Sequence, residues 1–368
     1  MFLFGIIKLE ETPSRQMKID FPVSIFQGAA LGLLLSLIAS ILSIFFAHKT
    51  GLIDIPGREP HKQHILPTPV SGGVALFIVL IIGWFINFRE FSDLLKIAVP
   101  LMLIFSIGLL DDYRGVHFWV KLVVEIIASG MLIAFGVQVH FIQIIFNGIP
   151  LQLANGLDIL ITLLWLVGMT NAYNFIDSMD GLVTGISIIA SSFLALTSVF
   201  SGQMNLAHFM AFLAAACYGL NFFNSPPARL FLGDSGALSL GFLLAVTSML
   251  YNPHSFPQPS SWFVPVMILG LPLFDICLVT VSRLRRHRPI YKADRTHTYH
   301  RLLMLGLSTQ QAVNVLHMVS IFLGCLAYVA LNQAPLIANI IFTSVILAGI
   351  VLIVILDNPS YLPEKENE

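Results

Sequence analysis

The feature that most constrains this chain is a series of long apolar runs that recur along nearly its whole length. A run of about 20 apolar residues is long enough to cross a lipid bilayer as an α-helix. The chain is 57% hydrophobic and 11% charged over 368 residues, whereas soluble domains carry about 25% charged residues. A soluble helical protein would also need polar helix faces, which these runs lack. The sequence therefore predicts an all-α polytopic membrane protein.

The runs predict about eleven transmembrane helices in a single domain, residues 22–357, between an N-terminal tail (1–21) and a C-terminal tail (358–368). The sequence shows no internal repeat and no second domain. The predicted spans lie at about 22–47, 70–88, 95–110, 118–138, 155–173, 182–200, 205–223, 237–250, 262–282, 311–331 and 335–356.

Lysine and arginine are concentrated in the loops on one side of these spans. Loops rich in Lys and Arg stay in the cytoplasm, so we expect the N-terminus outside, the C-terminus inside and this set of loops facing the cytoplasm. The net charge of −1 provides no electrostatic attraction for nucleic acid. The loops with candidate active-site residues are 48–69, 111–117, 174–181, 224–236 and 283–310.

Acidic residues capable of chemistry fall in this same set of loops. Asp111 and Asp112 follow the third span. Two carboxylates at a helix C-terminus are unfavourable unless a cation is close, either Lys121 or a metal ion. The ordinary alternative is a solvated helix end.

A second polar segment, which contains Asn171, Asn174, Asp177 and Asp180, lies between the fifth and sixth spans. A helix cap needs one such side chain, and this segment provides four. If the segment is helical, Asp177 and Asp180 lie on one face. The excess of polar groups favours a functional site over a simple cap.

Two further loops complete the set. Asp234, in a glycine-rich turn before the eighth span, is either an N-cap or a ligand for a hard cation that binds oxygen. The basic loop that ends at His297, His300 and Arg301 is either a topological anchor or a phosphate-binding surface. Acids for a divalent cation and bases for phosphate, on one membrane face, suit phosphoryl transfer.

Seven short motifs occur in order between Gly51 and Ser308. They are Gly51-Leu-Ile-Asp-Ile-Pro56, Pro67-x-Pro-x-x-Gly-Gly73, Gly108-Leu-Leu-Asp-Asp112, Asn171-x-x-Asn-x-x-Asp-x-x-Asp-Gly-Leu182, Phe231-Leu-Gly-Asp-Ser-Gly236, Pro272-x-x-Asp275 and His297-x-x-His-Arg-Leu302. In this order they resemble the polyprenyl-phosphate N-acetylhexosamine-1-phosphate transferases of glycosyltransferase family 4. The resemblance is to the bacterial undecaprenyl-phosphate GlcNAc-1-phosphate transferases, with the lipid I translocase as a more distant relative.

The resemblance implies an enzyme that transfers a sugar-1-phosphate, above all GlcNAc-1-phosphate, from a UDP-sugar to undecaprenyl phosphate and releases UMP. This would be the first membrane step of a cell-envelope glycan, such as cell wall or lipopolysaccharide. The implied partners are the UDP-sugar, undecaprenyl phosphate and the bilayer of a bacterial inner membrane, with a homodimer left open. The implied cofactor is Mg²⁺, with Mn²⁺ as the alternative.

The resemblance also implies roles for individual residues. Asp111 would handle the lipid phosphate, and Phe231 would stack on uracil. The implied catalytic residues are Asp111, Asp112, Asp180 and Lys121. The implied metal ligands are Asp234 and Asn174. The implied substrate-binding residues are Asn174, Asp177, Phe231, His297, His300 and Arg301.

The chain departs from the family pattern at Tyr299, where a histidine is usual. His297 and His300 are three residues apart, so on one helical turn they would share a face. We therefore expect the two histidines to contact phosphate, and Tyr299 to point elsewhere and to act in packing or as a secondary hydrogen-bonding group.

Two other function classes remain open at this point. A transporter could use Asp158 and Asp275 as coupling carboxylates, because acids inside spans are costly and usually functional. Most acids of this chain, however, lie at helix ends, whereas transport sites tend to lie at the bilayer midplane. A non-catalytic lipid-binding scaffold is the third reading, and it would tolerate loss of the aspartates.

Overall fold

The computed structural model describes residues 23–55, 67–86, 95–142, 148–252, 263–287 and 297–358. The N-terminal tail, most of the C-terminal tail and parts of the 48–69 and 283–310 loops lie outside these ranges. The described chain is mainly α-helical, as predicted. Its elements are α1 (Val23–Thr50), β1 (Ile53–Asp54), β2 (Thr68–Pro69), α2 (Gly72–Ile86), α4 (Leu95–Arg114), α5 (Phe118–Ala134), α7 (Leu151–Ile176), α8 (Leu182–Phe200), α9 (Met204–Asn224), α10 (Gly233–Leu250), α11 (Phe263–Ile268), α12 (Gly270–Arg285), α13 (Thr298–Met304), α14 (Thr309–Leu331) and α15 (Pro335–Leu356).

Each predicted span coincides with one of these helices or with the α11–α12 pair. Of the described helices, 7 are long and apolar enough to cross a membrane. They are α1, α7, α8, α9, α10, α14 and α15. The protein is therefore a multi-pass helical membrane protein. The remaining predicted spans fall on α2, α4, α5 and α11–α12, which are shorter or carry more charge.

The ninth predicted span, 262–282, is not one continuous helix. It is divided at Leu269 into α11 and α12. Pro272 lies in the first turn of α12. Proline has no backbone N–H and its ring clashes with the preceding turn, so the hydrogen-bond ladder of a helix is interrupted there.

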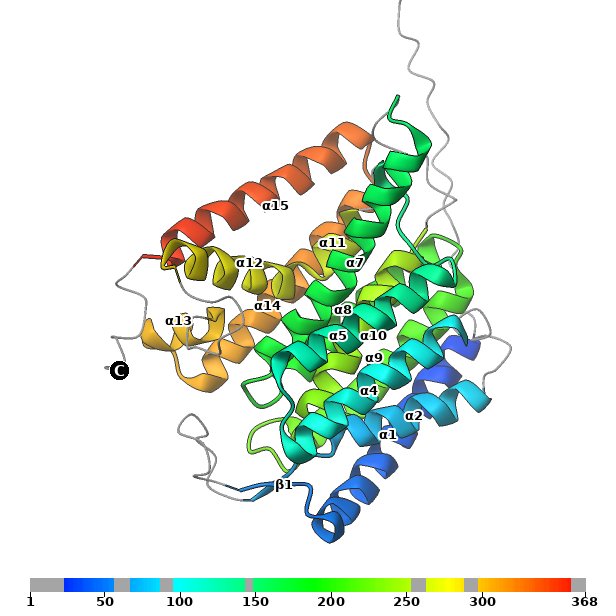
Figure 1. Ribbon diagram of the computed structural model, residues 1–368, viewed down its shortest axis with the longest axis vertical. Coiled ribbons are helices and arrows are strands. Elements are labelled where there is room, and N and C mark those ends of the chain that lie inside the picture. Colours follow the sequence, from blue (N-terminus) through cyan, green and yellow to red (C-terminus); the bar gives the residue numbers. More distant parts are fainter. Residues whose placement is uncertain are drawn as a thin grey trace, which may run out of the picture.

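The core is centred on α10, which packs against α2, α4, α7 and α8 (Figure 1). Nearly every α10 residue from Ser235 to Ser248 is buried. The C-terminal helix α15 is the opposite case, because Ala338 is its only buried residue. Figure 1 shows α15 running along the outside of the bundle, with its last turn at the same end as α13 and β1.

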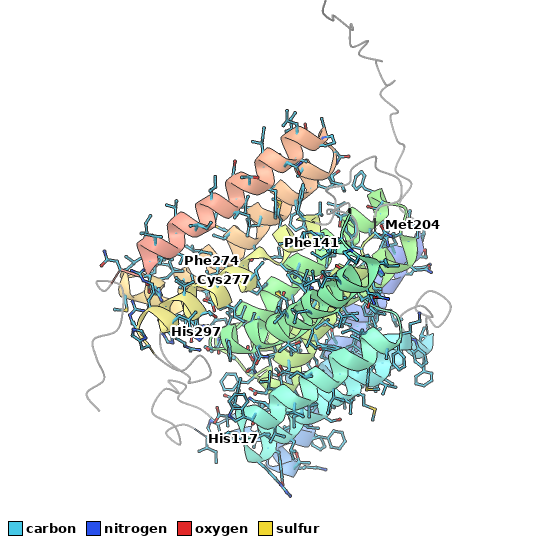
Figure 2. All side chains as sticks on the ribbon, turned by 45° about the horizontal axis from the view of Figure 1, so that its top comes forward. His117, Phe141, Met204, Phe274, Cys277 and His297 are labelled. Atoms are coloured by element: carbon cyan, nitrogen blue, oxygen red, sulfur yellow. The ribbon has the colours of Figure 1, made fainter. Side chains whose placement is uncertain are left out.

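The two ends of the bundle differ in their side chains. Figure 2 places His117, just before α5, and His297, just before α13, at one end, and Met204, the first residue of α9, toward the other. The loops that carry most of the predicted site residues lie at the first end.

Candidate active site

The amino end of α10 is held by the carboxyl end of α4. Asp112 accepts hydrogen bonds from the backbone N–H groups of Asp234 (2.7 Å to Oδ1) and Ser235 (3.0 Å to Oδ2). A carboxylate is stabilised at a helix N-terminus by the unpaired N–H groups and by the helix dipole. Gly108, one turn earlier, permits this approach, because a Cβ there would lie 2.6 Å from Ser235 Cα. Asp112 thus positions the turn that carries Asp234.

Lys121 joins the two acids that the sequence places in separate motifs. Its Nζ lies 2.7 Å from Asp111 Oδ2 and 2.8 Å from Asp234 Oδ2. Asp111 is also held by a hydrogen bond from the Val116 backbone N–H. The Asp234 side chain remains 31% exposed, so a ligand that enters from solvent can reach it. The predicted grouping of Asp111, Lys121 and Asp234 is present in the structure.

The Asn174–Gly181 segment does not form the continuous helix that would align its acids. Helix α7 ends at Ile176 with Asp177 as its C-cap, so Asn174 lies on the last turn of the helix. Asp180 lies in the turn before α8, where its Oδ2 accepts the Ala228 N–H at 3.1 Å. The helical condition under which Asp177 and Asp180 would share a face is therefore not met, because the chain turns between them.

Asp177 nevertheless lies within the influence of the other acids. Burial, together with the charges of Asp234, Asp112 and Asp180, raises the pKa of Asp177 well above its usual range. Like charges that crowd one carboxyl group disfavour its ionised form. The tertiary structure has thus brought acids from three motifs together around one point.

Asn224, at the end of α9, is a residue that the sequence analysis missed. Its Oδ1 accepts hydrogen bonds from the Gly181 N–H (3.2 Å) and the Thr184 hydroxyl (3.0 Å). Its Nδ2 donates to the Leu230 carbonyl at 2.9 Å. Through these hydrogen bonds Asn224 links the turn that carries Asp180 to the loop just before Phe231. The pattern that could have revealed it is the pair Asn221 and Asn224, one turn apart, ending an otherwise apolar helix.

The proline–glycine motif docks on the backbone around Phe231. The Phe231 N–H donates to the Pro69 carbonyl (2.8 Å), and the Phe231 carbonyl accepts from the Gly72 N–H (3.0 Å). Gly73 is in such close contact that a Cβ would lie 2.3 Å from the Gly236 nitrogen. Glycine is required where two backbones meet this closely. The Phe231 side chain is half-buried. Its backbone is held by hydrogen bonds through both its N–H and its carbonyl group.

His297 is held in place by Asp275 of α12. Its Nδ1 lies 2.8 Å from Asp275 Oδ2, while Oδ1 accepts the Thr298 N–H (2.7 Å) and the Thr298 hydroxyl (2.6 Å). The centroid of the His297 ring also lies 5.9 Å from that of the Phe175 ring. Phe175 lies between Asn174 and Asp177 in the sequence. The histidine loop thus reaches the carboxyl end of α7, next to the acids.

Tyr299 does not point away from the histidines, which corrects the sequence-based expectation. Its ring centroid lies 5.9 Å from that of His297, with the planes 11° apart, and 4.1 Å from that of His300. Tyr299 is buried, and His300 is half-exposed. The three rings lie at the start of the short helix α13, where neighbouring side chains contact one another. The burial of Tyr299 supports its expected role in packing.

The structure does not place Arg301 beside the acids that contact Lys121, or on an open surface. The side chain is 0% exposed and donates to the Leu356 carbonyl and to the Ser282 hydroxyl (3.1 Å). A guanidinium committed to these partners is not oriented to bind a phosphate from solvent. Its expected role as a phosphate contact is not supported by this placement.

Glu125 and Asn171 form another contact that the sequence analysis missed. Glu125 lies one turn after Lys121 on α5 and is 1% exposed. Asn171 donates from Nδ2 to the Glu125 carboxylate and to the Val167 carbonyl (2.9 Å). This contact fixes α5, which carries Lys121, against α7, which carries Asn174. An acid four residues after Lys121 in an apolar run is the sequence signal that could have indicated it.

The cluster suits a hard divalent cation in its chemistry. Among the described residues, no group of three His, Cys, Asp or Glu side chains is arranged to hold a metal ion. The Lys121 ammonium instead lies between Asp111 and Asp234, where it provides positive charge among carboxylates. The donors are oxygen atoms, and the pKa of Asp177 is raised first by burial and then by the charges of the neighbouring acids. Oxygen donors in negative surroundings are what Mg²⁺ prefers.

Comparison with known proteins identifies the family. A sequence model described as glycosyl transferase family 4 matches residues 94–252. A probable undecaprenyl-phosphate N-acetylglucosaminyl 1-phosphate transferase of Bacillus subtilis is 30% identical over 292 residues, which cover 79% of this chain and 80% of the relative. A decaprenyl-phosphate N-acetylglucosaminephosphotransferase of Mycobacterium tuberculosis is 28% identical over 84% of this chain and 85% of the relative. A phospho-N-acetylmuramoyl-pentapeptide-transferase of Lactobacillus johnsonii is 29% identical over 76% and 89%.

The chain belongs to glycosyl transferase family 4. The resemblance drawn from the seven motifs is thereby confirmed. The matched region, 94–252, contains α4, α5, α7, α8, α9 and α10. These are the family helices that carry the acids and Lys121, whereas the histidine loop follows the matched region.

The two acids of the transporter alternative have structural partners in this family 4 protein. Asp158 is fully buried, and its Oδ1 accepts the Ile142 N–H at 2.8 Å. Asp275 is bound to His297 and Thr298. Nothing in the comparisons supports transport, and each carboxylate holds a neighbouring segment of the chain through backbone N–H groups.

Proposed function

We propose that this enzyme transfers GlcNAc-1-phosphate from UDP-GlcNAc to undecaprenyl phosphate and releases UMP. The observation that carries the proposal is the meeting of Asp111, Lys121 and Asp234, which come from separate motifs, at 2.7 and 2.8 Å. The names of the Bacillus subtilis and Mycobacterium tuberculosis relatives support both the sugar and the polyprenyl phosphate. The product would feed the assembly of a cell-envelope glycan.

In the reaction an oxygen of the lipid phosphate attacks the phosphorus next to the sugar, and the bond from that phosphorus to the oxygen of UMP breaks. Catalysis of this kind is mainly positioning and charge neutralisation. Mg²⁺, with Mn²⁺ as the alternative, would be held by Asp234 and Asn174 and would neutralise the nucleotide phosphates.

The remaining residues would orient the two substrates. Asp111, held by Lys121 and the Val116 N–H, would position the acceptor, whose phosphate is already largely dianionic at pH 7 because its second pKa is about 6. Lys121 would balance the charge between the acids. Phe231 would stack on uracil.

Asp177 would contact the nucleotide from the end of α7, with Asp180 fixing the neighbouring turn. His297 and His300 would contact the pyrophosphate. An imidazole close to an anion favours its charged form, which donates two hydrogen bonds. We also propose eleven spans, an outside N-terminus and a cytoplasmic active site in a bacterial inner membrane.

The decisive experiment is to incubate purified protein with UDP-GlcNAc, Mg²⁺ and undecaprenyl phosphate and to measure UMP. We expect UMP release that requires the lipid and stops on chelation with EDTA. Parallel reactions with other UDP-sugars test the choice of sugar. A transporter or a lipid-binding scaffold would release no UMP.

Reporter fusions test the proposed topology separately. Fusions after Arg114 and Arg229 should read as cytoplasmic, and a fusion near Gln203 as external, because basic loops stay in the cytoplasm. A reversed pattern would contradict the cytoplasmic active site while leaving the reaction itself intact.

A further inference from the structure

The C-terminal helix α15 ends in a buried acid although the helix itself is almost entirely exposed. Apart from Ala338, no residue of Pro335–Leu356 is buried. The next residue, Asp357, has a side chain only 1% exposed. A helix that buries little of its length but withdraws its last carboxylate from solvent is anchored mainly at that end.

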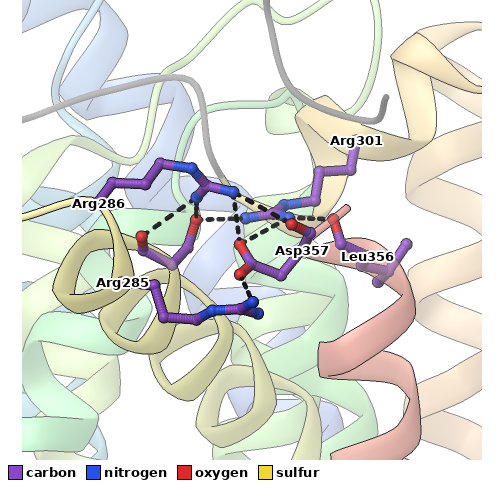
Figure 3. A network of polar contacts seen from close by, with 6 residues as sticks. Arg285, Arg286, Arg301, Leu356 and Asp357 are labelled. Atoms are coloured by element: carbon purple, nitrogen blue, oxygen red, sulfur yellow. Dashed lines mark hydrogen bonds and ion pairs between the residues drawn. The ribbon is translucent and has the colours of Figure 1, made fainter. Parts of the chain in front are cut away.

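Three arginines surround this carboxylate (Figure 3). Asp357 Oδ2 lies 2.8 Å from Arg285 Nη1, and Oδ1 lies 2.9 Å from Arg286 Nη2 and 3.8 Å from Arg301 Nη1. Arg286 also donates to the Asp357 carbonyl at 3.1 Å. Together Arg285, Arg286, Arg301 and Asp357 form what we call the arginine latch.

The latch has the electrostatic properties of a specific contact. Burial opposes ionisation of Asp357, but hydrogen bonds from Ser282 and Arg286 and the charges of Arg286 and Arg301 outweigh it and hold the pKa of Asp357 below its usual range. The guanidinium groups also neutralise the negative end of the α15 dipole. A fully buried arginine such as Arg301 needs these partners, because an unpaired buried charge is strongly destabilising.

The latch touches the histidine loop through Arg301, a residue of α13. This short helix begins next to His297 and contains His300. Its first turn is fixed by Asp275, which binds His297 and Thr298. Its later part is fixed by Arg301, which reaches Ser282 of α12 and the carboxyl end of α15. Asp275 thus contacts the start of α13, and Asp357 lies beside the arginine that holds its later part.

We propose that Asp357 and Arg301 are positioning residues that hold His297 and His300 in place, so that the C-terminal helix takes part in binding the UDP-sugar. The kinetic part of this inference rests on the proposed function. The structural part, that α15 orders α13, does not.

The structural part is tested by hydrogen–deuterium exchange over residues 298–304 in Asp357→Asn. We expect faster exchange there than in the wild type, because the amide leaves the arginines without their charged partner. Asp357→Glu should restore slow exchange. The matched control is Phe342→Leu, which loosens α15 through its stacking on Phe263 (4.7 Å between centroids) without touching the latch. Unchanged exchange in Asp357→Asn, or equal acceleration in Phe342→Leu, would overturn the inference.

The kinetic part is tested by comparing the KM for UDP-GlcNAc with that for undecaprenyl phosphate. Loss of histidine hydrogen bonds to an anion should raise the UDP-GlcNAc KM of Asp357→Asn by about tenfold, with the lipid KM unchanged. Adding His300→Ala should cause little further loss, because residues that act through one another are not additive. Full additivity would show that Asp357 acts independently of the histidine. If the wild type releases no UMP, the proposed reaction fails, and exchange alone decides the latch.

Discussion

The acids around Lys121 and the arginine latch lie at the same end of the bundle, but their charges are balanced in different ways. In the first region, Lys121 lies between carboxylates of α4 and α10. The pKa of Asp177, in the α7–α8 turn, is raised by burial and by its acidic neighbours. In the second, Asp357 has arginine partners on two elements and its pKa is lowered. Among the described contacts, two acids share one lysine in the first region, and three arginines share one acid in the second.

This difference separates chemistry from positioning. A cluster with excess negative charge and a partly exposed Asp234 is prepared to receive a cation and phosphates. A buried carboxylate that faces several arginines holds helices in place. Substitutions in the first region should therefore reduce turnover, whereas those in the second should change order or affinity.

The largest effect is expected for Asp234→Asn. The amide keeps the size of the side chain but loses the charge that would hold Mg²⁺, so we expect kcat to fall by about 10²–10³-fold. The measurement is UMP release across a Mg²⁺ titration, in which excess Mg²⁺ should rescue activity only in part. Near-normal turnover at ordinary Mg²⁺ would remove Asp234 from the metal site.

Neighbouring acids on α4 provide a sharper test of the same contrast. Asp111→Asn should lower kcat by about 10²-fold with UDP-GlcNAc binding preserved, because Asp111 faces Lys121. Asp112→Asn should instead lower stability by about 1 kcal/mol, since it weakens the cap on α10. The measurements are steady-state kinetics and thermal unfolding in detergent. If Asp111→Asn raised the UDP-GlcNAc KM and left kcat unchanged, Asp111 would belong to the nucleotide site.

The histidine loop should show an intermediate effect. His297→Ala and His300→Ala each remove a hydrogen bond to an anion, which predicts a loss in kcat/KM of about 10–100-fold. Tyr299→Phe should remain within about 3-fold of wild type, since a hydroxyl removed at a packing position costs little. UMP assays on the three variants are sufficient. Should Tyr299→Phe prove the most damaging, the division of roles in this loop would be wrong.

The smallest effect is expected for Asp158→Asn, which also serves as the matched Asp-to-Asn control for the acid cluster. The amide oxygen can still accept the Ile142 N–H, so UMP release should stay within about 2-fold of wild type. A large loss of UMP release with normal folding would instead give Asp158 a role in the transferase reaction.

Local patterns were enough to predict much of this protein. Apolar runs of bilayer length indicate helices wherever they occur, because the backbone must satisfy its own hydrogen bonds in lipid. The glycines and acids of the motifs likewise identified the α4, α10 and α7–α8 segments before their contacts were known. The break at Leu269 was missed, although Pro272 signalled it.

Tertiary structure alone decided what each polar residue does. Asp111 and Asp112 are adjacent in the sequence, yet one faces Lys121 and the other caps α10. Arg301 belongs to the histidine motif but is bound to Asp357, far along the chain. Helical periodicity is set by neighbouring residues, so the sequence by itself determined the helices. The partner of a side chain depends on which helices pack together, and only the folded structure determines that.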